Sequence, residues 1–429
     1  MAAQWQAGSE PGTGVSRTHL PSVDLRAHLS PILKCLAVFG MWPTSAYTRV
    51  SAKVVALTTG LAMLSLVLMQ LVAEVMALAA SPVSGPTELY RFIYNFSVVD
   101  LHLQGLGKWA FMVARRRRYT RLVDRLQHCF RLSGLADTND SASVLATSQT
   151  AQKVAVTRLQ QQLSECRRLS MWATAFWLWV CVYGVTHWCL VPLIIGDNSL
   201  PFDALYLFDA SQPPLRQISK LVVHCLQYVA GLQNILLSVF FDLFVLWLHL
   251  LLCAQLRYLA DNLRRLRRVT DTDEHKKLLV ACVAHHSDLL STIQELNSCA
   301  GPSFFLQCFE NTIRMCMIAF MATTTVADQM QVWSSAQFFL AAVGQLFLYC
   351  WCGQQISHLT ESISDAAYDS GWEEHDVSTQ KNVAFIMQRA QKTIVFKGGW
   401  FYTLTTETFV ELLRLSFSYY TVLRNINDR

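Results

Sequence analysis

Seven stretches of the chain are apolar over about the length that a helix needs to cross the roughly 30 Å hydrocarbon core of a bilayer. The second stretch is the weakest by hydropathy, because Asp100, His102 and Lys108 interrupt it. The pattern predicts an all-α fold, a polytopic bundle of seven transmembrane helices. The expected spans are Val54–Ala80, Arg91–Ala114, Met171–Ile195, Leu221–Leu252, Phe304–Val326, Gln337–Ile356 and Phe401–Ile426.

The last span differs from the others because polar residues recur along one face of it. Steps of three or four residues keep side chains on the same side of a helix. Charged groups at membrane depth are costly, so this face should meet protein or water rather than lipid. We expect Glu407, Glu411 and Arg414 to be satisfied by one another and by the bundle, and the others to face a polar bundle or a pore. The polar positions are Thr403, Glu407, Glu411, Arg414, Ser418, Thr421 and Asn425.

Basic residues between the spans predict the orientation of the chain in the membrane. Arg115–Arg118 follow the second span, and a second basic segment, Arg257–Lys277, follows the fourth. The loops Ser81–Tyr90, Gly196–Pro214 and Ala327–Ala336 contain no Lys or Arg. The positive-inside rule therefore places the N-terminus in the cytoplasm and the C-terminus outside, the reverse of a G-protein-coupled receptor. A run of arginines can also bind nucleic acid, but beside an apolar span we interpret it as a topology anchor and expect no nucleic-acid partner.

Apolar stripes at helical spacing continue outside the spans, on the expected cytoplasmic side. They predict a packed helical base, the alternative being ordinary loops that lie on the lipid surface. We expect the helix chain to break at Gly398-Gly399, before a pore helix. The expected divisions are a cytoplasmic segment 1–53, spans one to four in 54–252 with a cytoplasmic loop 115–170, anchor helices in 253–301, spans five and six in 302–356, a second anchor part with the start of helix seven in 357–399, and the pore helix 400–429.

Composition agrees with a membrane protein and offers little other chemistry. Of 429 residues, 52% are hydrophobic and 15% charged, against about 25% charged in soluble domains. The thirteen cysteines include no CxxC pair, and no phosphate-binding or nucleophile motif is present. We therefore expect neither an enzyme nor a cofactor or metal site.

Motifs in the last hundred residues resemble those of a known family. Gln345–Gly353 (QLFLYCWCG), with Tyr368, Trp372 and Gln391 after it, resembles the C-terminal signature of insect odorant receptors. Ser416–Arg424 (SFSYYTVLR) is similar to the closing motif of the odour-tuning subunits of that family. The co-receptor and the gustatory receptors have a Thr-Tyr pair where this chain has Ser418-Tyr419. The resemblance extends back to about Met171.

The resemblance implies a ligand-gated, non-selective cation channel in the plasma membrane of olfactory neuron dendrites. The family assembles as a heterotetramer of tuning subunits with a shared co-receptor, which would be the partner here. Each seventh helix would line one central pore. An apolar ring can stop ions by dewetting, and Val422 with Ile426 falls at the family's constriction. The implied pore residues are Ser418, Thr421, Val422, Asn425 and Ile426.

The same resemblance implies a small apolar and aromatic pocket for a volatile organic ligand. It would lie in the outer half of the bundle, between the second, third, fourth and sixth spans. Aromatic residues at helical spacing also serve as ordinary core packing, so each position has that alternative. The implied pocket residues are Tyr94, Val98, Cys181, Tyr183, Gly184, His187, Trp188, His224, Tyr228 and Phe338.

Three other functions are compatible with seven spans. A gustatory-type channel of the same superfamily would differ in its ligands and closing motif. A G-protein-coupled receptor requires an external N-terminus. A secondary transporter predicts saturable uptake, although the chain shows no interrupted spans at matching positions in two halves.

Overall fold

The computed structural model describes residues 25–43, 50–81, 85–135, 147–195, 200–206, 216–324, 329–399 and 401–427. Over these ranges the fold is all-α apart from one two-stranded hairpin, as the spans predicted. The helices are α1 (Leu25–Val38), α2 (Val50–Ala80), α3 (Pro86–Leu135), α4 (Thr147–Ile195), α5 (Arg216–Leu266), α6 (Thr272–Thr324), α7 (Gln329–Tyr368), the 3-10 turn η2 (Trp372–Glu374), α8 (Val377–Gln391) and α9 (Thr406–Asn427).

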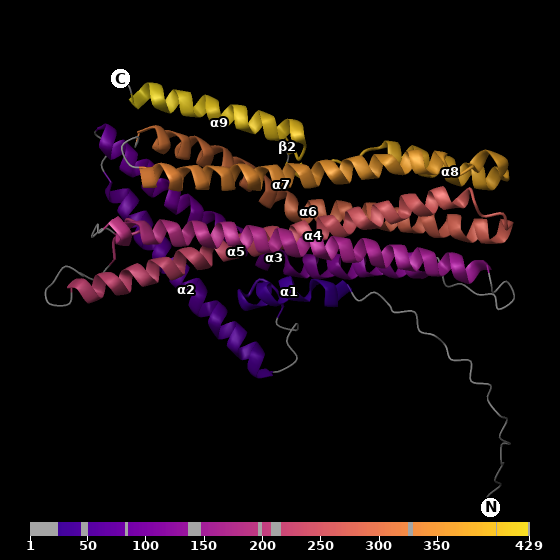
Figure 1. Ribbon diagram of the computed structural model, residues 1–429, viewed down its shortest axis with the longest axis horizontal. Coiled ribbons are helices and arrows are strands. Elements are labelled where there is room, and N and C mark those ends of the chain that lie inside the picture. Colours follow the sequence, from indigo (N-terminus) through magenta and orange to yellow (C-terminus); the bar gives the residue numbers. More distant parts are fainter. Residues whose placement is uncertain are drawn as a thin grey trace, which may run out of the picture.

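The long helices α3, α4, α5, α6 and α7 run roughly along one axis and form the body of the bundle (Figure 1). α5 lies at its centre, with 89% of its most apolar stretch buried, and α3, α4, α6 and α7 all pack against it. α9 lies along one edge, against α6 and α7. α1 and α2 lie on the opposite edge, where α2 leans away from the bundle (Figure 1). α9 therefore lies on one edge of the bundle, and α1 and α2 lie on the opposite edge.

The long helices continue beyond the expected spans without a break. The segment 115–170, expected as the cytoplasmic connection between two spans, is helical where it is described, since α3 extends to Leu135 and α4 begins at Thr147. The reason is burial along the extension of α3, where Tyr119 packs edge-on against Phe241 and Phe244 of α5. Leu122 and Val123 are each 1% exposed in the same stretch. An apolar stripe with a packing partner favours helix over loop.

The first half of α6, the end of α7 and α8 pack together into a helical base, as the apolar stripes predicted. Leu289, Ile293 and Leu296 of α6 are fully buried, and the end of α7 buries Ile363. Val383 of α8 is also fully buried, and α8 packs against both α6 and α7. These contacts favour a packed base over loops that lie separately on a lipid surface.

A hairpin separates the base from the last helix. Lys397–Gly398 (β1) pairs antiparallel with Tyr402–Thr403 (β2), and Gly399 turns the chain with a φ of +64°. The break expected at Gly398-Gly399 is present, but α9 begins at Thr406 rather than at Phe401. The hydroxyl of Thr405 accepts the Thr408 N–H at 3.2 Å, which is the geometry of a helix N-cap. The cap and the strand pairing explain the later start.

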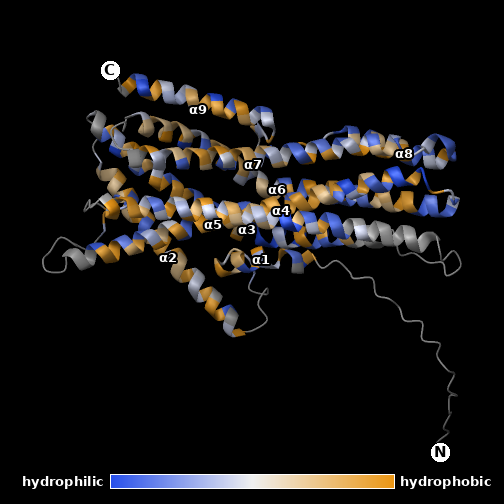
Figure 2. Ribbon diagram, in the orientation of Figure 1, coloured by the Kyte–Doolittle hydropathy of each residue, from blue (hydrophilic) through white to orange (hydrophobic). Residues whose placement is uncertain are grey.

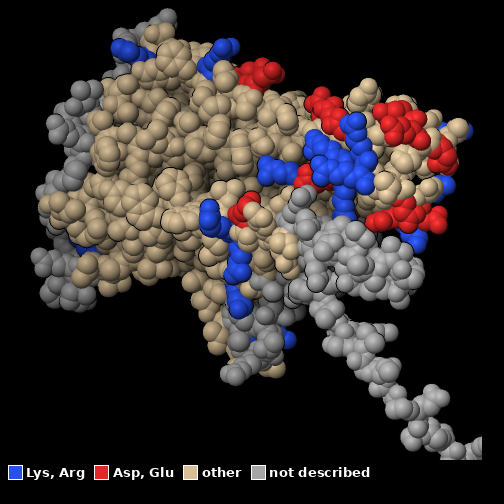
Figure 3. All heavy atoms as spheres, turned by 45° about the vertical axis from the view of Figure 1, so that its right-hand side comes forward, with Lys and Arg blue, Asp and Glu red and all other residues tan. Residues whose placement is uncertain are grey.

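Four helices in the described chain are long and apolar enough to cross a membrane by composition alone, α2, α4, α5 and α7. α3, α6 and α9 do not reach that threshold because they carry ionisable residues within their spans. Hydrophilic residues concentrate at the end of the bundle near α8 (Figure 2). Charged side chains crowd that same end, while a broad surface of the other half carries few (Figure 3). This distribution is typical of a membrane-embedded half and a polar base.

Candidate ligand pocket and pore helix

Three aromatic side chains from different helices meet in the half of the bundle that lies away from the base. Tyr94 of α3 stacks on Trp188 of α4, with ring centroids 5.6 Å apart and planes at 15°. Phe338 of α7 meets Trp188 edge-on at 5.0 Å. The Tyr94 hydroxyl and the Trp188 indole N–H both donate to the carbonyl of Pro201, at 2.7 and 3.3 Å. The segment after α4 therefore covers the cluster and fixes the orientation of both rings.

Two small cavities adjoin this aromatic cluster. The outer cavity has a volume of about 60 Å³, and its walls are largely apolar. The inner cavity has a volume of about 80 Å³ and lies between α3, α4, α5, α6 and α7. Both cavities share Leu101, Arg314 and Phe338 as wall residues. They therefore form two neighbouring chambers with a common wall.

Several residues that line the inner cavity have buried polar atoms without a hydrogen-bond partner in the described chain. Within the described chain, Nε2 of Gln104, Nε1 of Trp177, Oδ1 of Asn234 and Oε1 of Gln337 are buried without a partner. Gln104 and Asn234 are 3% and 1% exposed. Buried polar groups are normally paired with protein or water. The inner cavity thus offers both donors and acceptors to whatever fills it.

Six of the ten residues expected in a pocket line these two cavities. The other four lie outside both walls. Tyr183 is 42% exposed and stacks between Trp179 and His187. His187 hydrogen-bonds the Ser334 hydroxyl at 3.2 Å, His224 the carbonyl of Cys189 at 2.9 Å, and Tyr228 the hydroxyl of Thr186 at 3.1 Å. The six that line the cavities are Tyr94, Val98, Cys181, Gly184, Trp188 and Phe338.

Gly184 has a specific steric role in the inner cavity. A methyl group at this position would come within 3.0 Å of Nε2 of Gln337, so the amide of Gln337 occupies the space that a side chain would need. The contact between Gly184 of α4 and Gln337 of α7 lets the two helices come closer here than a larger residue at 184 would allow. The sequence indicates Gly184, but it does not indicate Gln337.

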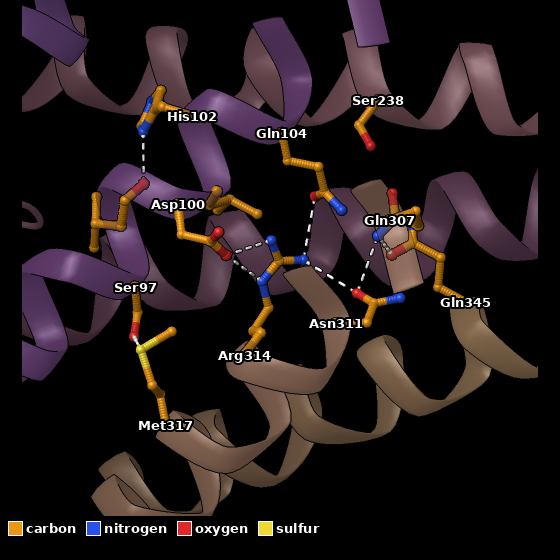
Figure 4. A network of polar contacts seen from close by, with 12 residues as sticks. Ser97, Asp100, His102, Gln104, Ser238, Gln307, Asn311, Arg314, Met317 and Gln345 are labelled. Carbon is orange, nitrogen blue, oxygen red and sulfur yellow. Dashed lines mark hydrogen bonds and ion pairs between the residues drawn. The ribbon is translucent and has the colours of Figure 1, made fainter. Parts of the chain in front are cut away.

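Arg314, which lines both cavities, belongs to a buried ion pair (Figure 4). The Arg314 guanidinium of α6 donates to Asp100 of α3 at 2.6 and 3.1 Å, and also to Gln104 at 3.2 Å. Arg314 also contacts Asn311 one turn earlier, at 3.5 Å. The side chains of Arg314 and Asp100 are only 9% and 13% exposed. Each charge therefore depends on the other for its stability in the bundle.

The hydrogen bonds continue from this pair toward the base. Gln307 donates to Asn311 and to Gln345 of α7, each at 3.0 Å. Gln345 donates to Asp242 of α5 at 2.6 Å. Asp242 also accepts from Lys108 of α3 at 2.7 Å and from the Tyr349 hydroxyl. The network thus joins α3, α5, α6 and α7 below the cavities.

Sequence reasoning did not assemble this network, although a signal exists. Asp100, Gln104 and Lys108 recur at steps of four and therefore share one face of α3. Gln307, Asn311 and Arg314 recur in the same way on α6. Helical spacing identifies each polar face, but it does not say which face meets which.

The polar row of α9 points away from the bundle of its own chain. Glu407, Glu411 and Arg414 are all exposed, and no ion pair joins Glu411 to Arg414 among the described residues. The expectation that they would be satisfied within the bundle is therefore wrong for the single chain. The three side chains stay exposed because α9 contacts α6 and α7 through its opposite face, where Leu412 and Ser416 are buried.

The residues expected at the pore lie on this exposed side of α9. Val422 and Ile426 are 53% and 60% exposed, although both are apolar. Ser418 and Asn425 are exposed as well, and Thr421 is half-buried with its hydroxyl bonded to the Ser418 carbonyl at 2.7 Å. One face of α9 therefore combines polar and apolar groups and lacks a partner within the described chain.

The fold is also that of a solved receptor. The structure of the insect olfactory receptor OR5 from Machilis hrabei in complex with eugenol superposes with a TM-score of 0.75. The match covers 94% of this chain and 99% of that one, at 17% sequence identity. At this identity the similarity establishes the fold.

Curated relatives share parts of the sequence. Odorant receptor 85c of Drosophila melanogaster is 27% identical over 184 residues, which cover 41% of this chain and 47% of that one. Odorant receptor 10 of Aedes albopictus is 24% identical over 245 residues, which cover 56% and 64%. The chain therefore spans about half to two thirds of the length of these relatives.

The family comparison covers a larger part of the chain. The profile described as 7tm Odorant receptor matches residues 91–417, which include the aromatic cluster, both cavities, the buried network and the first half of α9, and it ends before Ser418. Receptors of this kind are not enzymes, which agrees with the sequence. The chain belongs to the 7tm odorant receptor family of insects.

Proposed function

We propose that this chain binds a small volatile organic molecule in the two cavities and forms, with the shared co-receptor of the family, a ligand-gated, non-selective cation channel. One observation carries the proposal. Arg314 lines both cavities and lies on α6, and α6 is a helix against which α9 packs. A ligand that displaces this residue acts directly on the helix that supports α9.

The cavities favour a ligand with an apolar body and one polar group. The outer cavity offers the rings of Tyr94, Trp188 and Phe338, which suit an aromatic or aliphatic body. The inner cavity offers unpaired donors and acceptors, which suit a hydroxyl or carbonyl oxygen. Eugenol, which the Machilis hrabei receptor binds, is an aromatic compound with a hydroxyl group and is a suitable first probe.

The pore proposal rests on the exposed face of α9. Charged and polar side chains at membrane depth require water or a partner, and a water-filled pore between subunits supplies both. Val422 and Ile426 are one turn apart and would form apolar rings in a tetramer. Such rings block ions by dewetting when narrow and conduct when a rotation of α9 removes them from the axis.

Coupling requires that a ligand bind two arrangements of the helices with different affinity. The buried network supplies contacts that can differ between arrangements, since it links α3, α5, α6 and α7 through directional hydrogen bonds. A ligand oxygen that bonds Gln104 changes the partners available to Arg314, which donates to Gln104. In this mechanism the energy of binding biases the position of α6 and α7, and α9 follows.

The test is electrical recording from cells that express this chain with and without an insect co-receptor. A volatile panel that includes eugenol should evoke cation currents only when both subunits are present. Labelling of an extracellular tag at the C-terminus verifies surface delivery and orientation. Absence of current with both subunits on the surface, or saturable uptake of a ligand without current, contradicts the proposal.

A further inference from the structure

A further cavity lies at the edge formed by α1, α2 and α3, and none of its lining residues belongs to the two cavities of the proposed ligand pocket. Its volume is about 940 Å³, at the upper end of the roughly 300–1,000 Å³ typical of small-molecule sites. This edge lies opposite to α9 (Figure 1), so in a tetramer with α9 at the centre the groove would face lipid. Neither ligand binding nor the pore makes use of it.

The groove has an apolar part and a basic part. Leu57, Leu61 and Leu64 of α2 line one wall, and Leu57 and Leu61 are 57% and 60% exposed. Trp109 of α3 faces them, and its indole N–H is already bonded to the Phe39 carbonyl at 3.1 Å. The rings of Phe39 and Trp42 form part of the lining as they pack against α5.

The basic part occupies one end of the groove. Lys53 of α2 and Arg116, Arg117 and Arg121 of α3 line it. Within the described residues none of these four forms an ion pair, whereas Arg125, one turn further on, pairs with Glu295 at 3.0 Å. The groove therefore contains a concentration of positive charge with no acidic group among its lining residues.

The order of these residues along the helices gives the groove a direction. α2 and α3 run in opposite senses, so Lys53 and Arg116–Arg121 lie at the same end and Leu64 and Trp109 lie deeper. Lys53 and Leu64 are eleven residues apart, or about 16 Å along a helix. A charged end at the surface and an apolar track toward the membrane centre match the shape and polarity of a phospholipid.

We propose that this groove binds an anionic phospholipid of the cytoplasmic leaflet, with its phosphate and headgroup at Lys53, Arg116 and Arg117 and one acyl chain along Leu57, Leu61 and Leu64. Guanidinium groups bind phosphate with two parallel hydrogen bonds, and basic pockets between transmembrane helices on the cytoplasmic side hold acidic headgroups. The bound lipid would fasten α2, which leans away from the bundle, to α3.

Native mass spectrometry of the purified full-length chain in detergent tests the site without relying on channel activity or orientation. The probes are phosphatidylserine and phosphatidylcholine, added separately. The wild-type chain should bind phosphatidylserine more tightly. The variant K53Q/R116Q/R117Q should bind it at least about tenfold more weakly, since each basic residue near an anionic lipid contributes severalfold.

Two further variants separate the groove from general surface charge. R267Q/R268Q/K277Q removes the same charge from exposed positions at the α5–α6 turn and should leave the affinity within about twofold. L61W narrows the apolar track and should weaken binding of both lipids. Equal affinity of the wild type for both lipids, equal losses in the two charge variants, or an unchanged affinity in L61W would overturn the proposal.

Discussion

Arg314 of α6, which lines both cavities, forms a buried ion pair with Asp100 of α3 at 2.6 Å. The pair has two roles in the bundle. It holds two long helices together, and it places a charge beside the proposed ligand. Its removal should therefore affect stability and response in different ways.

The first prediction concerns the stability of that pair. Asp100→Asn leaves the Arg314 charge without its counter-ion and should destabilise the bundle by about 3–5 kcal/mol, whereas Asp100→Leu with Arg314→Met should recover most of the loss. Thermal unfolding of the purified chain, followed by size-exclusion chromatography, measures both. If the loss of stability in the double variant equals the sum of the losses from Asp100→Leu alone and Arg314→Met alone, the two residues are not coupled and the prediction is wrong.

The second prediction concerns the aromatic cluster. Trp188→Ala removes the ring that contacts both Tyr94 and Phe338, and the concentration of odorant for half-maximal current should rise by about tenfold. Tyr183→Ala is the matched control, because Tyr183 lies on the same helix but outside both cavities. Equal shifts in the two variants would move the ligand away from this cluster.

The third prediction concerns the polar groups of the inner cavity. Gln337→Leu keeps the size of the side chain but removes an unpaired acceptor and a donor. The response to a hydroxyl-bearing odorant should weaken by about fivefold or more, since a lost hydrogen bond in a buried site is worth about 1 kcal/mol or more. The response to the corresponding hydrocarbon should stay constant, and a parallel loss for both ligands would argue for a purely structural role.

The fourth prediction concerns the pore face of α9. Val422→Ala and Ile426→Ala shrink the proposed apolar rings, so current in the absence of odorant should increase severalfold as the dewetted segment widens. Val410→Ala is a matched control on the same helix, with 42% exposure. Single-channel recording with the co-receptor measures the change. Unaltered leak and conductance in both ring variants would exclude this constriction.

The fifth prediction concerns acid stability of the helical base. Burial lowers the pKa of His285 and His286 to about 4, with His286 adding to the effect on His285 and Arg389 to that on His286. An unfolded histidine titrates near 6.5. Between about pH 4 and 6.5 the unfolded chain binds more protons, so the free energy of unfolding falls by up to about 1.4 kcal/mol per pH unit for each histidine as the pH drops.

Thermal unfolding of the purified chain across this range measures the slope. H285Q/H286L should flatten it, because both depressed groups are gone. His358→Gln serves as the control, because the side chain of His358 is exposed. An unchanged slope in the double variant would assign the acid sensitivity to other groups.

Local pattern sufficed for much of the fold. Apolar runs of about twenty residues predicted the spans, because transfer to lipid requires them. Apolar residues at helical spacing, such as Leu289, Ile293 and Leu296, predicted the packed helices beyond the spans. The same reasoning placed the polar row on one face of α9. It did not indicate that strand pairing delays the start of α9, or that long-range packing extends α3 as far as Leu135.

The candidate site shows more clearly what the sequence alone does not predict. The sequence by itself determined that Tyr94, Trp188 and Phe338 lie on helices of the bundle, and the resemblance suggested that they meet. Only the tertiary structure decided that Arg314 reaches Asp100, 214 positions earlier in the chain, and that Glu407, Glu411 and Arg414 face away from their own bundle. Periodicity determines which side chains share a face of one helix, but the partner of each face depends on how all the helices pack together.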